Sequence, residues 1–180
     1  MTPWSQAAYR QASWFAGKAH IGQTLPGSDV SYVLHLSQVS MEVMAALCRE
    51  RFENGDLAVQ CALLHDVIED TAVTVDELAA EFSEAVVNGV LALTKNTQLA
   101  GGKPAWMRDS LARIREQPRE VWLVKLADRV TNLQVPPAHW TPEKIAYYRT
   151  EAQEIYAALG DASPYLGQRL QESILRYNAG

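Results

Sequence analysis

The sequence lacks the features that would assign it to a membrane, secreted or nucleic-acid-binding class. None of its apolar runs approaches the roughly 20 residues that a membrane-spanning helix needs. The first six residues carry neither the basic region nor the apolar core of a secretory signal. The net charge of -5 is opposite in sign to the basic surface that nucleic acid calls for. These absences predict a cytoplasmic protein with no membrane partner and no nucleic-acid partner.

Cysteine is also scarce, with two residues in the whole chain. Cys48 and Cys61 show no CxxC spacing, and each falls inside an apolar helical pattern. A small apolar side chain in such a pattern is usually buried. We therefore predict two reduced, buried thiols.

The overall composition is ordinary for a soluble globular protein, with 48% hydrophobic and 21% charged residues among 180. Apolar residues recur at intervals of three and four, and no convincing period-2 alternation appears. The pattern predicts an all-α fold and one domain over residues 1–180. Helices are predicted over residues 4–20, 32–51, 83–94, 120–133 and 163–178, with others starting near residues 56, 74, 104 and 141.

Local signals mark several helix starts. Asp56 is a candidate N-cap, and Thr74 with Glu77 has the spacing of a capping box. Thr141 and Ser163 each precede a proline, which suits an N-cap followed by the first helical position. The helix over residues 120–133 is apolar on nearly all sides, which predicts a central position in the fold.

The most informative stretch is residues 61–71, where an apolar run leads into four polar side chains. On a continuous helix, His65 and Glu69 would form one i,i+4 pair, and Asp66 and Asp70 would form the next. An adjacent histidine and aspartate on a buried-looking helix are costly unless something pairs them. A metal ion is a natural partner.

Two further polar side chains, His35 and Asp128, interrupt apolar helices. Taken alone, a buried histidine is more often a hydrogen-bonded core residue, and an aspartate beside Arg129 usually forms a salt bridge. Together with His65 and Asp66 they place two imidazoles and two carboxylates on three helices. This donor set suits Mn²⁺, Fe²⁺ or Zn²⁺ and does not favour a soft thiolate site.

These residues reproduce the H…HD…D pattern of the HD-domain phosphohydrolases. Residues 62–71 resemble the ALLHDxxEDT segment of the hydrolase domain in RelA/SpoT homologues and in stand-alone small alarmone hydrolases. Residues 124–133 resemble the KLADRxxNL segment of that family, and residues 19–23 resemble its AHxGQ segment. The resemblance covers roughly residues 10–160.

The resemblance implies an HD-domain helical bundle with a metal site at its centre. It further implies one manganese ion held by His35, His65, Asp66 and Asp128. A bound metal ion of this kind lowers the pKa of water and neutralises charge on phosphoryl oxygens.

The resemblance also implies a reaction, the removal of pyrophosphate from the 3′ position of a guanosine polyphosphate alarmone. Glu69 and Asp70 would act on the water that attacks phosphorus. Asn132 matches an asparagine of the family that contacts the nucleotide. Lys125 and Arg129 are candidates for binding the phosphates, and they could equally be structural partners of nearby carboxylates.

The sequence departs from the family directly after the AHxGQ segment. The family usually carries an Arg-Lys pair there, whereas residues 24–29 of this chain read Thr-Leu-Pro-Gly-Ser-Asp. Ser28 is a candidate contact to a phosphate or base edge, with a local turn bond as the alternative. Tyr148 is a candidate for the stacking face that the loop no longer offers. A guanine alarmone, an adenine alarmone or another phosphorylated nucleotide therefore fits the residues.

Two rival functions remain at this level. One is an HD-domain nucleotidase or phosphatase that releases orthophosphate from a nucleotide or from an NADPH-like dinucleotide. The other is a nucleotide-sensing module without turnover, although such a module would not need all the metal-binding and acidic residues present. At 180 residues we expect no synthetase domain. The pattern assigns no oligomeric state.

Overall fold

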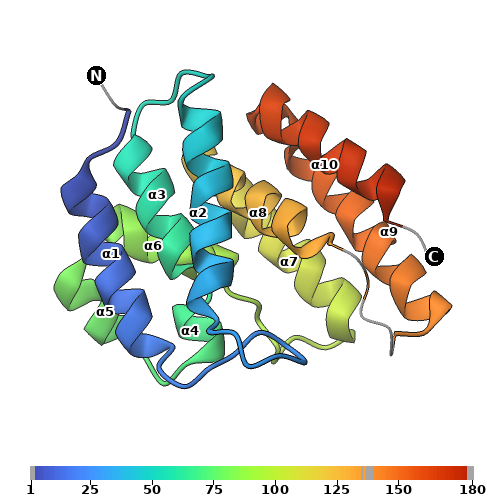
Figure 1. Cartoon of the computed structure of the whole chain (residues 1–180), viewed down its shortest axis with the longest axis horizontal. Coiled ribbons are helices and arrows are strands. Elements are labelled where there is room, and N and C mark those ends of the chain that lie inside the picture. The colour runs from blue at the N-terminus through green and yellow to red at the C-terminus, as the bar shows by residue number, and fades with distance from the viewer. Residues whose placement is uncertain (1–2, 135, 137–139, 178–180) are drawn as a thin grey trace.

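Helix α8 (Arg119–Asn132) lies at the centre of the fold, between α2 and the two C-terminal helices (Figure 1). The computed structural model describes residues 3–134, 136 and 140–177. Every residue of α8 from Leu123 to Thr131 is buried, including the charged ones. The predicted central position of this segment is therefore confirmed.

The described residues form an all-α structure, as predicted, in which an isolated β-bridge pairs Thr24 with Ser31. The remaining helical elements are α1 (Gln6–Ala19), α2 (Val33–Leu47), α3 (Gly55–Leu64), α4 (Val67–Asp70), α5 (Val75–Glu81), α6 (Glu84–Leu93), α7 (Gly102–Arg115), α9 (Pro142–Leu159), the 3₁₀ turn η1 (Gly160–Ala162) and α10 (Pro164–Arg176). No helix in this part of the chain combines the length and the apolar character needed to cross a membrane.

Side-chain caps define several helix starts at the predicted residues. Thr74 and Glu77 form a reciprocal capping box at the start of α5. Thr141 accepts a hydrogen bond from the Lys144 amide, and Ser163 caps α10 in the same way. Because each cap satisfies an amide that the first helical turn leaves unpaired, the helices begin where these residues lie.

Two predictions about single residues were wrong. The N-cap of α3 is Asn54, whose side chain accepts from the Leu57 amide, while Asp56 accepts hydrogen bonds from Ser5 instead. Cys48 is exposed because α2 ends at Leu47, so only Cys61 is a buried thiol.

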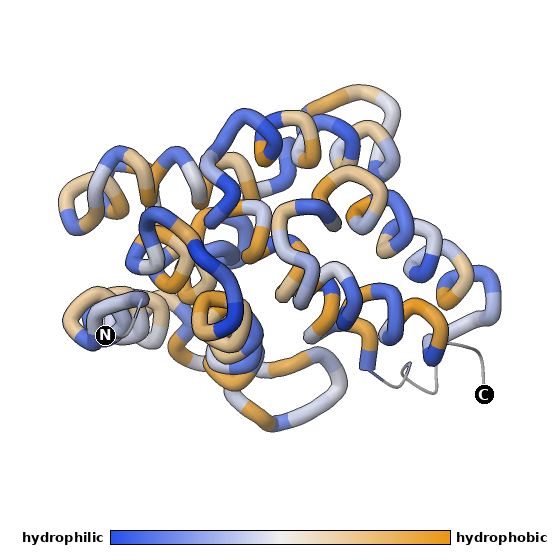
Figure 2. The backbone as a smooth tube through the Cα atoms, turned by 90° about the horizontal axis from the view of Figure 1, so that it is seen from above, coloured by the Kyte–Doolittle hydropathy of each residue, from blue (hydrophilic) through white to orange (hydrophobic). Residues whose placement is uncertain are grey.

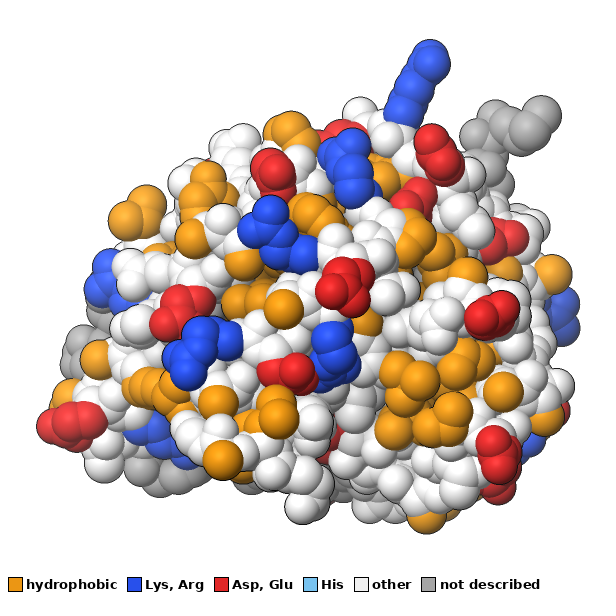
Figure 3. Space-filling model, turned by 180° about the vertical axis from the view of Figure 1, so that it is seen from behind, with side chains coloured by type: hydrophobic (Ala, Val, Ile, Leu, Met, Phe, Trp, Pro, Cys, Tyr) orange, Lys and Arg blue, Asp and Glu red, His pale blue; other side chains and the backbone are white. Residues whose placement is uncertain are grey.

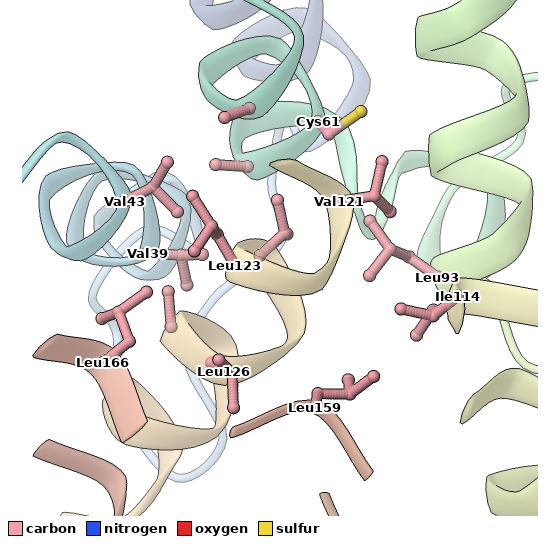
Figure 4. Close-up of a cluster of buried hydrophobic side chains, with 14 of the residues drawn as sticks. Val39, Val43, Cys61, Leu93, Ile114, Val121, Leu123, Leu126, Leu159 and Leu166 are labelled. Atoms are coloured by element: carbon pink, nitrogen blue, oxygen red, sulfur yellow. The ribbon is translucent and has the colours of Figure 1, made fainter. Parts of the chain in front are cut away.

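The core gathers around α8. Figure 4 shows apolar side chains from six other helices converging on it, with Val39 and Val43 of α2, Cys61 of α3, Leu93 of α6, Ile114 of α7, Leu159 of α9 and Leu166 of α10 around Val121, Leu123 and Leu126. The helices carry both hydrophobic and hydrophilic residues, which recur from turn to turn as amphipathic helices require (Figure 2). On the face seen in Figure 3, basic and acidic side chains are interspersed, with apolar groups between them.

Close approach of α6 to α3 and α8 predicts a penalty for a larger side chain at Gly89. A Cβ there would lie 2.7 Å from Cys61 Sγ and 3.0 Å from a methyl group of Val121. We expect Gly89→Ala to lower the free energy of unfolding by about 1–2 kcal/mol, since overpacking outweighs the better helix propensity of alanine. Urea unfolding measures this change.

Gly17 in α1 is the matched control, because a Cβ there would meet nothing within 4 Å. Gly17→Ala is expected to raise stability by up to about 1 kcal/mol. A Gly89→Ala protein as stable as the Gly17→Ala protein would contradict the close packing.

Candidate metal and nucleotide site

The chain breaks its helix at the motif of residues 61–71. Helix α3 ends at Leu64, and α4 begins at Val67. The continuous helix predicted through this stretch was therefore wrong. His65 Nδ1 lies 2.9 Å from the Ala62 carbonyl oxygen, which an uninterrupted helix would pair with the Asp66 amide. This competing bond ends α3 and leaves both polar side chains at the corner between two helices.

Four side chains from α2, the α3–α4 corner and α8 converge at this corner. His35 Nε2 lies 3.4 Å from His65 Nε2, 3.7 Å from Asp66 Oδ2 and 3.5 Å from Asp128 Oδ1. His65 Nε2 lies 2.9 Å from Asp66 Oδ2 and 3.9 Å from Asp128 Oδ1. The structure therefore brings together the residues that the sequence singled out as metal ligands.

The chemistry of this cluster fits a metal ion. Among the described residues, His35, His65 and Asp66 offer ligand atoms that all lie within 4.8 Å of one another. Because His65 directs Nδ1 to a backbone carbonyl, its Nε2 is the nitrogen that faces the cluster. Both histidines are only 5% exposed, and buried imidazoles beside carboxylates suit a divalent first-row metal. The cluster could hold such an ion.

The charged groups of the cluster shift one another's pKa values. Burial alone would lower the pKa of His65, but the Asp66 and Asp128 carboxylates raise it to about 9. Burial likewise opposes ionisation of the two carboxyl groups, yet the pKa of Asp66 is lowered by His65 and that of Asp128 by Lys125 and the histidines. A proton on His65 thus offsets the carboxylates, and a metal ion would have to displace it.

A second set of side chains orients the carboxylates. The Tyr32 hydroxyl donates to Asp66 Oδ2 at 2.6 Å, and Asn132 donates from Nδ2 to Asp128 Oδ1. Burial and the neighbouring Asp66 raise the pKa of Tyr32 well above its usual range, so its hydroxyl stays a donor. Sequence reasoning missed Tyr32, although it lies three residues before His35 on the same approach to α2.

Lys125 and Arg129 both have structural partners. Lys125 Nζ lies 3.4 Å from Asp128 Oδ2. The Arg129 guanidinium carbon lies 4.2 Å from the centre of the Tyr148 ring, and Nη2 lies 3.7 Å from Glu151 Oε2. Both residues also line the cavity described below, so the structural partnership and contact with a ligand coexist.

Glu69 and Asp70 lie on α4, directly beyond the cluster. Lys95 holds both oxygens of Glu69, through its ammonium group at 2.6 Å and its amide at 3.0 Å. Gln23 Nε2 donates to Asp70 Oδ2 at 3.4 Å. Burial, together with Asp66 and Glu69, raises the pKa of Asp70. Two carboxyl groups in different environments thus lie side by side next to the candidate metal ligands.

A cavity of about 560 Å³ opens from the cluster, and a volume of this order accommodates a nucleotide-sized ligand. It includes the four candidate ligands, Glu69, Asp70, Asn132 and Tyr148. Sequence reasoning missed further residues that line it, namely Lys95, Thr97, Lys103, Trp106, Trp140 and Lys144. Trp140 and Lys144 lie four residues apart on either side of the Thr141 cap, a spacing that could have indicated a shared face.

Ser28 is not among the cavity residues. Its hydroxyl donates to the Leu25 carbonyl and accepts from the Val30 amide, both at 3.2 Å. The local turn bond is thus what the structure shows for this residue. His139 and the proline at position 137 lie outside the described residues.

A family model described as HD domain matches residues 12–165 of the chain. The chain belongs to the HD domain family. This membership agrees with the convergence of His35, His65, Asp66 and Asp128 and confirms the resemblance read from the sequence.

The chain is also similar to individual proteins that carry the name of a pyrophosphohydrolase. The chain is 36% identical over 157 residues to a Vibrio cholerae protein named guanosine-3′,5′-bis(diphosphate) 3′-pyrophosphohydrolase, covering 84% of this chain and 21% of that protein. It is 26% identical over 170 residues to the Xenopus tropicalis 3′-pyrophosphohydrolase MESH1, covering 92% of each. The chain thus spans about a fifth of the Vibrio relative and most of the MESH1 protein.

A solved structure, described as a metazoan ortholog of SpoT that hydrolyzes ppGpp and plays a role in starvation responses, superposes with a TM-score of 0.81 at 24% sequence identity. The match covers 96% of this chain and 97% of that chain. At this identity the superposition establishes the shared HD-domain fold.

The cluster predicts a stability gain on metal binding. Mn²⁺ at about 100 times its Kd should add roughly 2.7 kcal/mol to the metal-stripped protein. That gain corresponds to about 5–10 °C in Tm. His35→Ala should lose this shift, whereas Asp76→Asn, which removes an exposed carboxylate outside the cavity, should keep it. Differential scanning fluorimetry measures both, and a full shift in a cooperatively unfolding His35→Ala protein would exclude His35 as a ligand.

Proposed function

We propose that the protein is a metal-dependent phosphohydrolase that removes pyrophosphate from the 3′ position of a purine alarmone nucleotide, of the (p)ppGpp or (p)ppApp type. One observation carries the proposal. A buried cluster of two histidines and two aspartates adjoins a pair of carboxyl groups at one end of a cavity that also holds lysines and aromatic rings. The names of the Vibrio and Xenopus relatives support the same reaction.

In this proposal His35, His65, Asp66 and Asp128 hold one divalent ion, Mn²⁺ by family resemblance, with Fe²⁺ or Zn²⁺ as alternatives for the same donor set. When bound, such an ion lowers the pKa of water and neutralises charge on the phosphoryl oxygens. Tyr32 and Asn132 keep the two carboxylates oriented by donating to Asp66 and Asp128. This arrangement leaves each carboxylate a further oxygen or lone pair for a ligand.

Glu69 and Asp70 are the groups that handle the attacking water. Glu69 serves as the general base, because its carboxylate lies on α4 directly beyond the cluster and lines the cavity. Asp70 hydrogen-bonds a water molecule beside it, and its raised pKa fits a group that can accept and return a proton. Phosphoryl transfer needs mainly positioning and charge stabilisation, which these residues and the cavity cations supply.

The nucleotide lies along the part of the cavity formed by α8 and the start of α9. Asn132 and Tyr148 contact it there, and Tyr148 also packs edge-on against Trp140 at 5.3 Å. Residues 24–29 carry no cation that could stack on a base, and Ser28 is bonded within its own turn. We therefore expect aromatic side chains to bind the base, with both guanine and adenine accepted.

The absence of a cation from the loop of residues 24–29 also favours one alternative substrate. Without the Arg-Lys pair of the family, the cavity is equally open to a dinucleotide phosphate, from which an HD-domain phosphatase would release orthophosphate. Product analysis separates the two reactions. The Mn²⁺-loaded protein is incubated with 3′-pyrophosphorylated guanosine and adenosine nucleotides and with a nicotinamide dinucleotide phosphate. Pyrophosphate from the first two supports the proposal, while orthophosphate alone would replace it with the phosphatase reaction.

Glu69→Gln tests the assigned base. It should lower kcat by about 10²- to 10⁴-fold, because the amide cannot accept the proton of water. Glu84→Gln is the control, since Glu84 is exposed in the first turn of α6 and lies outside the cavity. Pyrophosphate release is measured for both, and a Glu69→Gln protein with the activity of the Glu84→Gln protein would remove Glu69 from the reaction.

A further inference from the structure

The contact between Glu69 and Lys95 is an obstacle to the role proposed for Glu69. The Lys95 amide donates to Oε2 at 3.0 Å, and the ammonium group donates to Oε1 at 2.6 Å. A carboxylate with both oxygens engaged by one residue has fewer lone pairs to offer a water molecule. A water molecule therefore competes with these two donors for Glu69, and release of one donor would strengthen the contact of Glu69 with water.

The hydrogen bond from the Lys95 amide to Glu69 comes from a segment that several other contacts hold in place. Helix α6 ends at Leu93, so the Lys95 amide turns away from the helix to Glu69. The Arg113 guanidinium from α7 caps this end by donating to the carbonyls of Leu91, of Ala92 at 3.1 Å and of Thr94 at 2.8 Å. Arg113 Nε also donates to Asp109 Oδ2 at 2.8 Å, which fixes the guanidinium group. The backbone amide is thus a fixed anchor for Glu69.

The Lys95 side chain differs from the amide in being partly exposed and flexible. The Lys95 side chain is 40% exposed, ends on a flexible four-carbon stem and lines the cavity. Because Glu69 lies directly beyond the cluster, its partner Lys95 lies at the same end of the cavity. A phosphate that enters this end would meet the Lys95 ammonium group beside Glu69.

Three other cavity cations contact groups other than Glu69. Lys125 is 6% exposed and paired with Asp128, and Arg129 is 4% exposed between Tyr148 and Glu151. Lys144 lies over the Trp140 ring, 4.0 Å from its centre. Lys95 stands apart from these because its partner is the carboxylate that the reaction needs.

We propose that Lys95 is a phosphate-binding residue that transfers its ammonium group from Glu69 to a phosphate of the bound nucleotide, so that Glu69 is freed only in the substrate complex. This inference rests on the proposed function. A phosphate oxygen competes well for an ammonium group because a charge-assisted hydrogen bond forms in either case. Glu69 meanwhile keeps its position through the Lys95 amide, which Lys95→Met and Lys95→Arg leave in place.

The kinetic test uses Lys95→Met, which keeps the amide and the aliphatic stem and removes the charge. Loss of one charge-assisted hydrogen bond to phosphate should raise KM by about 10- to 100-fold. The value of kcat should be retained, because Glu69 is free and still anchored. Lys95→Arg should restore KM to within a few-fold of the wild-type value. Lys18→Met removes an exposed lysine outside the cavity and should change neither parameter.

The binding test needs no turnover. Guanosine 3′,5′-bis(diphosphate) is titrated by calorimetry into Mn²⁺-loaded Glu69→Gln, with and without Lys95→Met. The double variant should bind about 10- to 100-fold more weakly, since the ammonium group then serves the phosphate alone. Lys18→Met in the Glu69→Gln background is the control and should bind like Glu69→Gln.

Two results would overturn the inference. A Lys95→Met protein with lowered kcat and unchanged KM would show that the ammonium group only orients Glu69. Equal binding by Glu69→Gln and the double variant would show that it does not reach phosphate. Failure of the proposed function is a separate result, in which the wild-type protein releases no pyrophosphate from any 3′-pyrophosphorylated nucleotide, and the calorimetric comparison then still decides the role of Lys95.

Discussion

A carboxylate buried on the central helix is the constraint on which the rest of the site depends. Asp128 is 8% exposed on α8, in a stretch of the helix whose residues from Leu123 to Thr131 are all buried. A buried charge of this kind is stable only when it is paired and hydrogen-bonded. Lys125 and Asn132 supply partners from the same helix, and His35 approaches from α2. The packing of α2 against α8 is therefore linked to the electrostatics of the site.

The break between α3 and α4 is the second feature that shapes the site. A continuous helix would have placed His65 and Asp66 on successive positions about 100° apart, each pointing in a different direction. The bond from His65 to the Ala62 carbonyl ends α3, and Asp66 then folds back to 2.9 Å from His65. The same break directs α4 toward the end of α6, where Lys95 meets Glu69. One local hydrogen bond thus arranges both the cluster and the pair of carboxyl groups beyond it.

The cavity combines two kinds of chemistry. Its lining includes the histidines and carboxylates of the cluster together with cations and aromatic rings, among them Trp140 directly before α9 and Lys144 and Tyr148 within it. Such a combination suits a ligand that joins phosphate groups to a flat base. The cations differ in how firmly they are held, since Lys125 and Arg129 are buried in structural pairs while Lys95 and Lys144 are exposed. A difference in exposure of this kind allows one set to maintain the site and the other to respond to a ligand.

The sequence by itself determined the all-α class and most helix starts. It also singled out His35, His65, Asp66 and Asp128, the four residues that converge in the cluster. Periodicity, caps and the spacing of polar residues are local properties, so they can be read without the fold. The sequence could not show that the helix breaks at His65, since that break arises from a side-chain bond competing with the helical amide. Only the tertiary structure decided that Lys95 holds Glu69 and that Tyr32 holds Asp66, because these contacts join residues 26 and 34 positions apart. It also decided that Ser28 stays within its turn while Trp106 lines the cavity. Contacts between distant segments depend on how the helices pack, and no local pattern encodes that packing.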